Sequence, residues 1–461
     1  MENITVKDIV EATGGKLLCG NEDTVLRNIC IDSRALQGDD LFVPFVGEKV
    51  DAHKFIPQVF ENGAVASLTC RTDIALGDKA LILVEEPLKA LQAIGRWYRK
   101  NRLSHLKIVG ITGSVGKTST REMVATALSA GMDVFSTKGN FNGQIGVPFT
   151  LSQMSSKDAA AVLEMGMSLF GEMEIISNIA CVDMAVVTNI GISHIENLGS
   201  QENIRSEKMH ITDGMPEGGK LILNGDDPLL ADYKVEKNLE TIYYGTTDAC
   251  KYRAMNIRTE DNRAVFEANC NGQVVTIHLK VPGMHNVLNT MAALAVACES
   301  GVDVIKAKEA LEAFEGFARR LQVLDDGPVT IIDDAYNASP DSMKAALQVL
   351  DSMKCNGRKV AVLADMLELG EDSPKYHFEV GVYAVDKRVD EYVLIGELAS
   401  WIGRAIDQYT EDFPVKYFTT NKQATDYLCE TLKPGDMVLF KGSNGMKLNE
   451  IIKEVKERVN D

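Results

Sequence analysis

Residues 108–119 read Ile108-Val-Gly-Ile-Thr-Gly113-Ser-Val-Gly116-Lys117-Thr118-Ser119, and this stretch decides the fold. An apolar run ends in a glycine-containing turn, and Lys-Thr then opens a helix that we expect over residues 118–130. Backbone N–H groups in such a turn, together with the helix N-terminus, surround phosphate oxygens. The compact TGxxGKT spacing predicts that Lys117 reaches the terminal phosphates of a nucleotide and that Thr118 ligates Mg²⁺. A chance turn with a surface lysine is the alternative.

Glu164 is the first candidate partner of this loop. It ends the apolar run 159–163, which reads as a parallel strand. A phosphate-binding loop needs a carboxylate on a neighbouring strand to hold its metal ion. A glutamate at the end of a strand is otherwise a turn or capping residue, but beside such a loop the pattern favours a metal ligand.

His194 and Lys208 follow the next short strand, which we expect over residues 184–188. Taken alone, His194 reads as a structural histidine with satisfied hydrogen bonds. Lys208 reads as part of a solvated helix face, because Glu202 and Glu207 lie nearby in the sequence. Neither residue carries a functional assignment by itself.

A second polar cluster follows an apolar strand expected over residues 329–333. Asp334, Tyr336 and Asn337 stand at the end of this strand. An aspartate and an aromatic ring in this place could serve an adenine, a ribose or a Mg²⁺-bound phosphate. A helix-capping turn at Ser339 explains the same residues equally well, so both interpretations stay open.

The whole chain divides into three stretches around these motifs. Residues 1–84 combine helices and turns with short strands, one of them expected over 40–47. Residues 85–318 alternate apolar strands and helices, with an antiparallel hairpin expected around Asn271-Gly272. Residues 319–461 repeat the strand–helix alternation. We therefore predict an α/β protein of three domains: a small mixed N-terminal domain, a central P-loop domain with a parallel sheet, and a C-terminal Rossmann-like domain.

Composition limits the partners and the location. The 461 residues include 48 Lys+Arg and 66 Asp+Glu, a net charge of −18, which argues against a nucleic-acid partner. No run approaches the ~20 apolar residues that span a bilayer. The nine cysteines are scattered singly, which indicates neither a disulfide framework nor a zinc site. The start of the chain lacks a secretory pattern, so we expect a cytoplasmic, monomeric protein without a membrane span.

Together the motifs resemble the Mur ligase family of ATP-dependent amide-bond ligases. The resemblance runs through most of the chain and rests on residues 112–118, Glu164, Asn189, His194, Lys208, Asn286, Asn289, Arg320 and residues 334–337. Residues 138–150, 193–200, 333–338, 363–370 and 438–446 are most similar to the family members that add D-alanyl-D-alanine to UDP-N-acetylmuramoyl-tripeptide in peptidoglycan precursor synthesis. Two positions depart from the family pattern. Asn444 stands where arginine is common, and Arg319 stands where glycine commonly precedes the arginine matched to Arg320.

The resemblance implies a division of labour between the domains and a reaction. The N-terminal domain would hold the UDP end of the substrate, the central domain would bind ATP, and the C-terminal domain would close over the site. The γ-phosphoryl group of ATP would pass to the substrate carboxylate, and the dipeptide amine would attack the acyl phosphate. The implied cofactors are ATP and two Mg²⁺, with Lys208 carbamylated. The implied catalytic residues are Lys117, His194 and Lys208. The implied ATP-binding residues are Gly113, Ser114, Val115, Gly116, Lys117, Thr118, Ser119, Asn289, Arg320, Asp334, Tyr336 and Asn337. The implied metal ligands are Thr118, Glu164, His194 and Lys208, and the implied substrate contacts are Ser33, Arg34, Lys49, Asp51, His53, Asn140 and Asn142.

Three other functions remain compatible with parts of the sequence. Another Mur-type or folylpolyglutamate-type ligase would share the same motifs and differ in its substrate. A regulatory P-loop ATPase would explain residues 113–118 but not Lys208 or residues 334–337. A non-catalytic nucleotide-sugar binding protein would not need Lys117.

Overall fold

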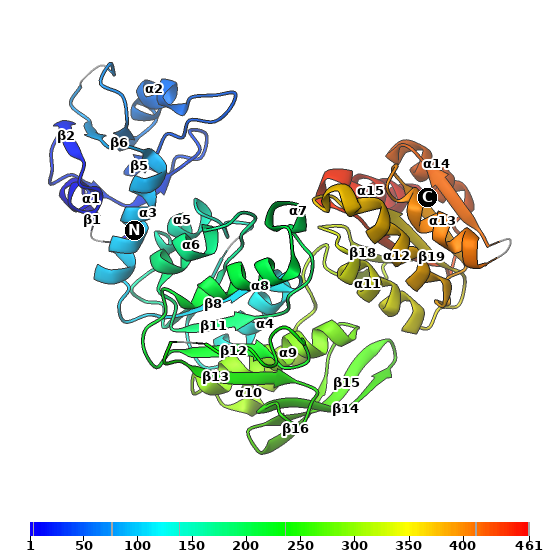
Figure 1. Cartoon of the computed structure of the whole chain (residues 1–461). Coiled ribbons are helices and arrows are strands. Elements are labelled where there is room, and N and C mark those ends of the chain that lie inside the picture. Colours follow the sequence, from blue (N-terminus) through cyan, green and yellow to red (C-terminus); the bar gives the residue numbers. More distant parts are fainter. Residues whose placement is uncertain (3, 75–76, 138, 236, 411–412, 460–461) are drawn as a thin grey trace.

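The computed structural model describes residues 1–2, 4–74, 77–137, 139–235, 237–410 and 413–459. Among the described residues, the three larger sheets come from successive chain segments and form three α/β domains, with the N-terminal and C-terminal domains on either side of the central one (Figure 1); a fourth sheet has two strands. The predicted fold class is confirmed. Within the described ranges, no helix has the length and apolar character needed to cross a membrane.

The N-terminal domain is built on a sheet of five described strands in the order β2-β7-β6-β5-β4. Its elements are β1 (Ile4–Thr5), α1 (Val6–Thr13), β2 (Lys16–Cys19), β3 (Val25–Leu26), β4 (Asn28–Cys30), β5 (Asp40–Phe42), η1 (Ala52–Phe55), α2 (Ile56–Glu61), β6 (Ala64–Thr69) and β7 (Ala80–Leu83). Strands β4 to β7 run parallel, and β2 is antiparallel to β7. Strand β5 is shorter than the expected 40–47 and ends before Pro44, which has no N–H for a ladder. Because β4, β5 and β6 are parallel neighbours, their carboxyl ends meet at one edge of the sheet.

Helix α3 (Pro87–Asn101) joins this domain to the central one. Leu91, Ile94 and Tyr98 recur at helical spacing and are buried in a core that extends from the N-terminal sheet into the central domain. The Tyr98 hydroxyl donates to the carbonyl of Met154 at 3.1 Å. The helix therefore packs on both domains.

The central domain has a sheet of nine described strands in the order β16-β15-β14-β13-β12-β11-β8-β10-β9. Its elements are β8 (Lys107–Thr112), α4 (Lys117–Ser129), β9 (Val134–Ser136), α5 (Gly146–Leu151), β10 (Ala160–Glu164), α6 (Glu172–Ala180), β11 (Met184–Val187), α7 (Ile195–Leu198), α8 (Gln201–Met209), η2 (His210–Thr212), β12 (Lys220–Asn224), β13 (Glu240–Gly245), β14 (Tyr252–Glu260), β15 (Arg263–Cys270), β16 (Gln273–His278), α9 (Met284–Glu299) and α10 (Val304–Ala313). Strands β8 to β13 are parallel, and their two faces are covered by separate apolar cores. The expected antiparallel segment forms β14, β15 and the edge strand β16.

The C-terminal domain has a sheet of six described strands in the order β17-β18-β22-β19-β20-β21. Its elements are β17 (Gln322–Leu324), β18 (Thr330–Asp334), α11 (Pro340–Ser352), β19 (Lys359–Ala364), η3 (Gly370–Asp372), α12 (Ser373–Val385), β20 (Glu391–Ile395), α13 (Ser400–Tyr409), β21 (Val415–Phe418), α14 (Asn421–Thr431), β22 (Met437–Lys441), η4 (Asn444–Met446) and α15 (Leu448–Val459). All but β17 are parallel, and helices cover both faces. In such sheets ligands bind at the carboxyl ends of the strands.

Candidate active site

The loop between β8 and α4 is shaped by two glycines. Gly113 has a φ of +147°, and a Cβ there would lie 1.8 Å from the Thr188 hydroxyl; Gly116 has a φ of +85°. A larger residue would displace the loop at either position. Asn189 holds the loop from the next strand end: its backbone carbonyl accepts from the Ser114 N–H at 3.0 Å, and its Oδ1 accepts from the Val115 N–H at 2.9 Å.

Lys117 lies folded against its own loop. Its ammonium donates to the Gly113 carbonyl at 2.8 Å, and burial lowers its pKa. The positive charge of Arg320 acts in the same direction, while Glu164 opposes it. This ammonium is well placed to bind phosphate oxygens. They are stronger hydrogen-bond acceptors than the backbone carbonyl oxygens and would take their place.

Glu164 ends β10 and is 3% exposed. Its Oε2 accepts from the Thr118 hydroxyl at 2.9 Å and from Arg121 at 3.1 Å, while its Oε1 accepts from the Asn142 amide at 2.9 Å. Arg121 is itself 1% exposed. The structure thus brings the two residues that the sequence proposed for one metal ion, Thr118 and Glu164, into direct contact.

The C-terminal domain reaches the same point through Arg320. One guanidinium nitrogen of Arg320 donates to the Thr118 hydroxyl at 3.2 Å, and the guanidinium lies over the Tyr336 ring, 3.9 Å from its centroid. Behind this pair, the buried ammonium of Lys441 contacts Asp334 Oδ2 at 2.5 Å. Asp334 also accepts from the backbone N–H of Leu321 at 3.2 Å. Asp334 therefore fixes the segment that carries Arg320.

His194 and Lys208 lie close to Lys117, in surroundings that disfavour positive charge. Burial, followed by the charges of Lys117 and Lys208, lowers the pKa of His194 to about 4. Burial, followed by the charge of Lys117, lowers the pKa of Lys208 well below its usual value. His194 has a φ of +64°, and its buried Nδ1 makes no hydrogen bond in the described structure, although Glu368 Oε2 is 3.0 Å away. The lowered pKa favours the neutral imidazole, which is the form that ligates a metal ion.

One cleft of about 800 Å³ gathers most of the predicted residues between the central and C-terminal domains. The predicted residues that line it are Ser114, Val115, Gly116, Lys117, Thr118, Ser119, Asn140, Asn142, Glu164, His194, Asn289, Arg320, Asp334, Tyr336 and Asn337. Asn289 also accepts from the Thr120 hydroxyl at 3.0 Å. Asn140 and Asn142, which the sequence predicts as substrate contacts, line this cleft beside the P-loop. Gly113 and Lys208 do not line the cleft.

The remaining predicted contacts belong to the N-terminal sheet edge, outside this cleft. Ser33 and Arg34 follow β4, and the Arg34 guanidinium pairs with Asp32 at 2.7 Å. Lys49 is exposed, whereas His53 is 1% exposed. His53 Nδ1 lies 2.7 Å from Asp51 Oδ1, and its Nε2 accepts the Cys70 N–H at 3.2 Å. In this conformation His53 braces the loop and does not present its ring to a ligand.

Sequence reasoning missed Arg121, Lys441 and Glu368 as site residues. Arg121 lies one helical turn after Lys117, so helical periodicity alone could have placed it on the same side of α4. Lys441 ends a buried strand, the position that also indicated Glu164. No local signal marks Glu368, because its contact with His194 crosses between domains.

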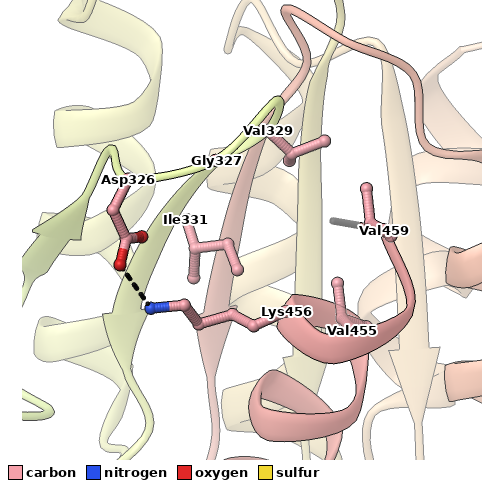
Figure 2. Close-up of a pocket in the computed structure, with 7 residues that line it drawn as sticks. All are labelled: Asp326, Gly327, Val329, Ile331, Val455, Lys456 and Val459. Atoms are coloured by element: carbon pink, nitrogen blue, oxygen red, sulfur yellow. Dashed lines mark hydrogen bonds and ion pairs between the residues drawn. The ribbon is translucent and has the colours of Figure 1, made fainter. Parts of the chain in front are cut away.

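A second hollow in the C-terminal domain carries no comparable chemistry. Figure 2 shows it between β18 and α15, lined by Asp326, Gly327, Val329, Ile331, Val455, Lys456 and Val459. Its only ion pair among the described residues joins Lys456 and Asp326 at 3.0 Å across the rim. The hollow is a packing seam at the end of α15.

The fold and the cleft together define a P-loop enzyme whose nucleotide site is completed by a second α/β domain. The model of the Mur ligase middle domain matches residues 111–297, and that of the Mur ligase glutamate ligase domain matches residues 319–444. The chain is 38% identical to UDP-N-acetylmuramoyl-tripeptide–D-alanyl-D-alanine ligase of Bacillus subtilis (strain 168) over 456 residues, 98% of each chain. This chain belongs to the Mur ligase family.

Solved structures agree with this assignment over nearly the whole chain. A crystal structure of MurF from Acinetobacter baumannii matches with a TM-score of 0.89 at 30% identity and covers 98% of both chains. MurF ligase from Thermotoga maritima, solved in complex with ADP, matches with a TM-score of 0.84 at 27% identity and covers 95% of this chain and 99% of its own. The likeness therefore includes the N-terminal domain, which neither family model covers.

Proposed function

We propose that this protein is an ATP-dependent ligase that joins the amine of D-alanyl-D-alanine to the free carboxylate of a UDP-N-acetylmuramoyl-tripeptide, with release of ADP and phosphate. The observation that carries the reaction class is the meeting of three elements at Thr118. Its hydroxyl belongs to the phosphate-binding loop, contacts the buried carboxylate Glu164, and accepts from Arg320 of the C-terminal domain. The names of the relatives support the choice of substrates.

The reaction follows from the weakness of a carboxylate as an electrophile. Transfer of the γ-phosphoryl group makes an acyl phosphate, and the dipeptide amine then displaces phosphate from it. Lys117 would exchange the Gly113 carbonyl for phosphate oxygens and offset their charge. Arg320, which donates to the Thr118 hydroxyl, would offset charge from the C-terminal domain. Closure of that domain excludes water, which would otherwise hydrolyse the acyl phosphate.

The residues at Thr118 fit a magnesium ion. Within the described ranges, no cluster of three or more His, Cys, Asp or Glu side chains forms a metal cage. Mg²⁺ does not require one, because it commonly takes one or two carboxylates together with water and substrate phosphates. Thr118 Oγ1 and Glu164 Oε2 supply two oxygen ligands 2.9 Å apart. When bound, Mg²⁺ supplies positive charge beside the phosphate oxygens. Arg121 and Asn142 would keep Glu164 in position.

His194 and Lys208 support a second cation site. The His194 ring, whose Nδ1 faces Glu368 at 3.0 Å, would supply one ligand, and carbamylation of Lys208 would convert a buried cation into an anionic oxygen donor. The surroundings favour this modification, because burial and the charge of Lys117 disfavour the ammonium form of Lys208. A neutral amine is the form that reacts with carbon dioxide.

We assign the nucleotide contacts to residues of both domains and the UDP end to the N-terminal sheet edge. The nucleotide contacts are Gly113, Ser114, Val115, Gly116, Lys117, Thr118, Ser119, Asn289, Arg320, Asp334, Tyr336 and Asn337. The substrate contacts are Ser33, Arg34, Lys49 and Asp51, with Asn140 and Asn142 at the reacting carboxylate. His53 would act by holding the loop of Asp51. Boundaries near residues 84 and 318 would separate the three domains.

Mass spectrometry of the product tests the proposal directly. ATP, Mg²⁺, UDP-N-acetylmuramoyl-tripeptide and D-alanyl-D-alanine are mixed with the protein, and both phosphate release and a new amide are followed. We expect both signals only when all components are present, and a loss of at least about 100-fold for Lys117→Ala. Equal turnover with D-alanine alone would contradict the dipeptide assignment. Turnover of a folate with glutamate would instead indicate a folylpolyglutamate-type ligase.

A further inference from the structure

A cysteine, a histidine and an aspartate outside the cleft lie in contact with one another. Cys70 directly follows β6, and its Sγ lies 3.5 Å from Nε2 of the buried His53. His53 Nδ1 lies 2.7 Å from Asp51 Oδ1, and Asp51 also pairs with Arg71. Cys70 is exposed, and no other cysteine in the described part of the chain is exposed to this degree.

The hydrogen bonds determine which nitrogen of His53 carries its proton. Nε2 accepts the backbone N–H of Cys70 at 3.2 Å, so it has no hydrogen of its own in the neutral ring. Nδ1 therefore carries the hydrogen and donates it to Asp51, whose carboxylate also accepts the His53 backbone N–H at 2.9 Å. The Nε2 lone pair is therefore directed at Cys70, where the backbone N–H at 3.2 Å and the thiol at 3.5 Å share it, and the carboxylate orients the ring. This is the arrangement of a nucleophile, a base and an orienting group.

The position of the thiol in the sheet connects it with the substrate. Strands β4, β5 and β6 are parallel neighbours, so Cys70 after β6 stands at the same edge as Ser33 and Arg34 after β4. The loop that carries Lys49 and Asp51 lies at the same edge, because His53 contacts both Asp51 and Cys70. Ligands of parallel sheets collect at this edge.

We propose that Cys70 is a base-assisted nucleophilic thiol that takes up small electrophiles, in particular low-molecular-weight disulfides, at the rim of the UDP-binding edge. The Cys70 sulfur attacks one sulfur of the disulfide while His53 Nε2 accepts the thiol proton. The new S–S bond forms as the old one breaks, and the departing thiolate then takes the proton. The product is a mixed disulfide that blocks the edge. This last consequence rests on the proposed function of the N-terminal domain, whereas the thiol chemistry does not.

Alkylation rates test the thiol chemistry. The full-length protein is treated with iodoacetamide, and the labelling rate of each cysteine is measured by peptide mass spectrometry. We expect Cys70 to react fastest and its rate to fall at least about tenfold in His53→Gln, which keeps an acceptor for the Cys70 N–H but lacks a base. Asp51→Asn is the second variant, because an amide does not fix the same tautomer, and circular dichroism verifies its fold. Unchanged Cys70 rates in a folded variant would overturn the proposal.

Treatment with oxidised glutathione tests the consequence for binding. The affinity for UDP and for ATP is measured by calorimetry before and after treatment, with Cys70→Ser as the control. We expect the treated protein to lose UDP affinity at least about tenfold, to keep ATP affinity, and to recover with dithiothreitol, while Cys70→Ser does not respond. Unchanged UDP affinity after complete modification would overturn the blocking role. Failure of the untreated protein to bind UDP would count against the proposed function instead, and the alkylation rates would still decide the thiol chemistry.

Discussion

At the scale of single residues, Arg121 and Glu164 form a buried pair beside the predicted metal ligand Thr118. The guanidinium is 1% exposed and the carboxylate 3% exposed, and Arg121 also pairs with the neighbouring Glu122. Removing Arg121 would leave the buried Glu164 carboxylate without this ion-pair partner. Arg121 therefore both stabilises the fold and competes with a metal ion for Glu164.

We predict that Arg121→Met lowers the free energy of unfolding by about 3 kcal/mol without Mg²⁺. Added Mg²⁺ should restore more of this stability in Arg121→Met than in the unchanged protein, because the ion can replace the lost positive charge. Thermal unfolding with and without Mg²⁺ measures the difference. Arg121→Lys is the matched control and should behave like the parent chain. An equal Mg²⁺ response in Met and Lys variants would show that Arg121 does not act through Glu164.

Lys208 gives a second prediction at this scale. Because burial lowers its pKa, the amine loses its proton at a lower pH than an exposed lysine, and the neutral amine is the form that carbon dioxide carbamylates. We expect a carbamate carbon signal from Lys208 in ¹³C NMR after incubation with labelled bicarbonate. The signal should be absent from Lys208→Arg and should fade on acidification, which protonates the amine. A spectrum identical to that of Lys208→Arg would contradict the modification.

At the scale of elements, the end of α9 is tied to two strands of the central sheet by Glu299. Its carboxylate forms ion pairs with Lys220 of β12 and with Lys251, whose ammonium lies 2.6 Å from Oε1. The carboxylate also accepts a hydrogen bond from the Tyr252 hydroxyl of β14 at 2.8 Å. Burial raises the pKa of Glu299, but these three partners outweigh it and lower the pKa to about 2. The carboxylate is thus more acidic in the folded state than in the unfolded chain.

This shift predicts a stability loss in acid. A group with a depressed folded pKa stabilises the protein fully above its unfolded pKa of 4.5 and loses this contribution as the pH falls towards about 2. We expect a contribution of about 2–3 kcal/mol at neutral pH. Chemical unfolding between pH 6 and about 2.5 should show a steeper decline in the parent than in Glu299→Gln, which has no proton to gain. Parallel curves would contradict this role.

The hairpin of β14 and β15 forms a separate link between domains. Asn262 at its tip donates to the Lys354 carbonyl at 3.1 Å and accepts from the Lys354 N–H at 2.6 Å, across to the loop after α11. Figure 1 shows this hairpin extending towards the C-terminal domain. Asn262 has a φ of +62°, which glycine also tolerates. Asn262→Gly therefore removes the side-chain contacts with little effect on the turn.

We predict that Asn262→Gly loosens the C-terminal domain by about 1 kcal/mol, the worth of two exposed hydrogen bonds. Spin or fluorescence labels on the central and C-terminal domains should report a wider distribution of distances. Asn256→Gly, in the same hairpin but without a contact to the C-terminal domain among the described residues, is the control. An unchanged distance distribution in Asn262→Gly would mean that the other contacts between the two domains suffice to hold the C-terminal domain in place.

At the scale of the whole molecule, the two ends of the proposed substrate site lie in different domains. The cleft is lined by the central and C-terminal domains, and none of the predicted UDP-end residues lines it. A substrate held at both places must bring the domains into one arrangement. We predict that ATP, Mg²⁺ and UDP-N-acetylmuramoyl-tripeptide together reduce the radius of gyration in small-angle X-ray scattering. Either ligand alone should produce a smaller change, and no change with all three would contradict closure.

Much of the fold and the centre of the site could be predicted from local patterns. Gly113 to Ser119 and Glu164 stand at the ends of apolar strands, and parallel strands bring their carboxyl ends to one edge. Arg320, Tyr336 and Asp334 were linked to the same nucleotide through family resemblance. Local patterns did not predict Arg121, Lys441 and Glu368 as site residues. Their roles depend on contacts with residues that lie 43, 107 and 174 positions away in the chain, respectively.

The sequence by itself determined the order of strands and helices, the phosphate-binding loop and the family. These depend on periodicity and on short motifs, where neighbouring residues interact directly. Only the tertiary structure decided that the buried Lys208 and the half-buried His194 lie where positive charge is disfavoured, that Asn140 and Asn142 line the cleft beside the P-loop, and that His53 faces Cys70. Burial and the distances between charges arise when distant segments pack together, and no local pattern records which groups will then share a low-dielectric environment.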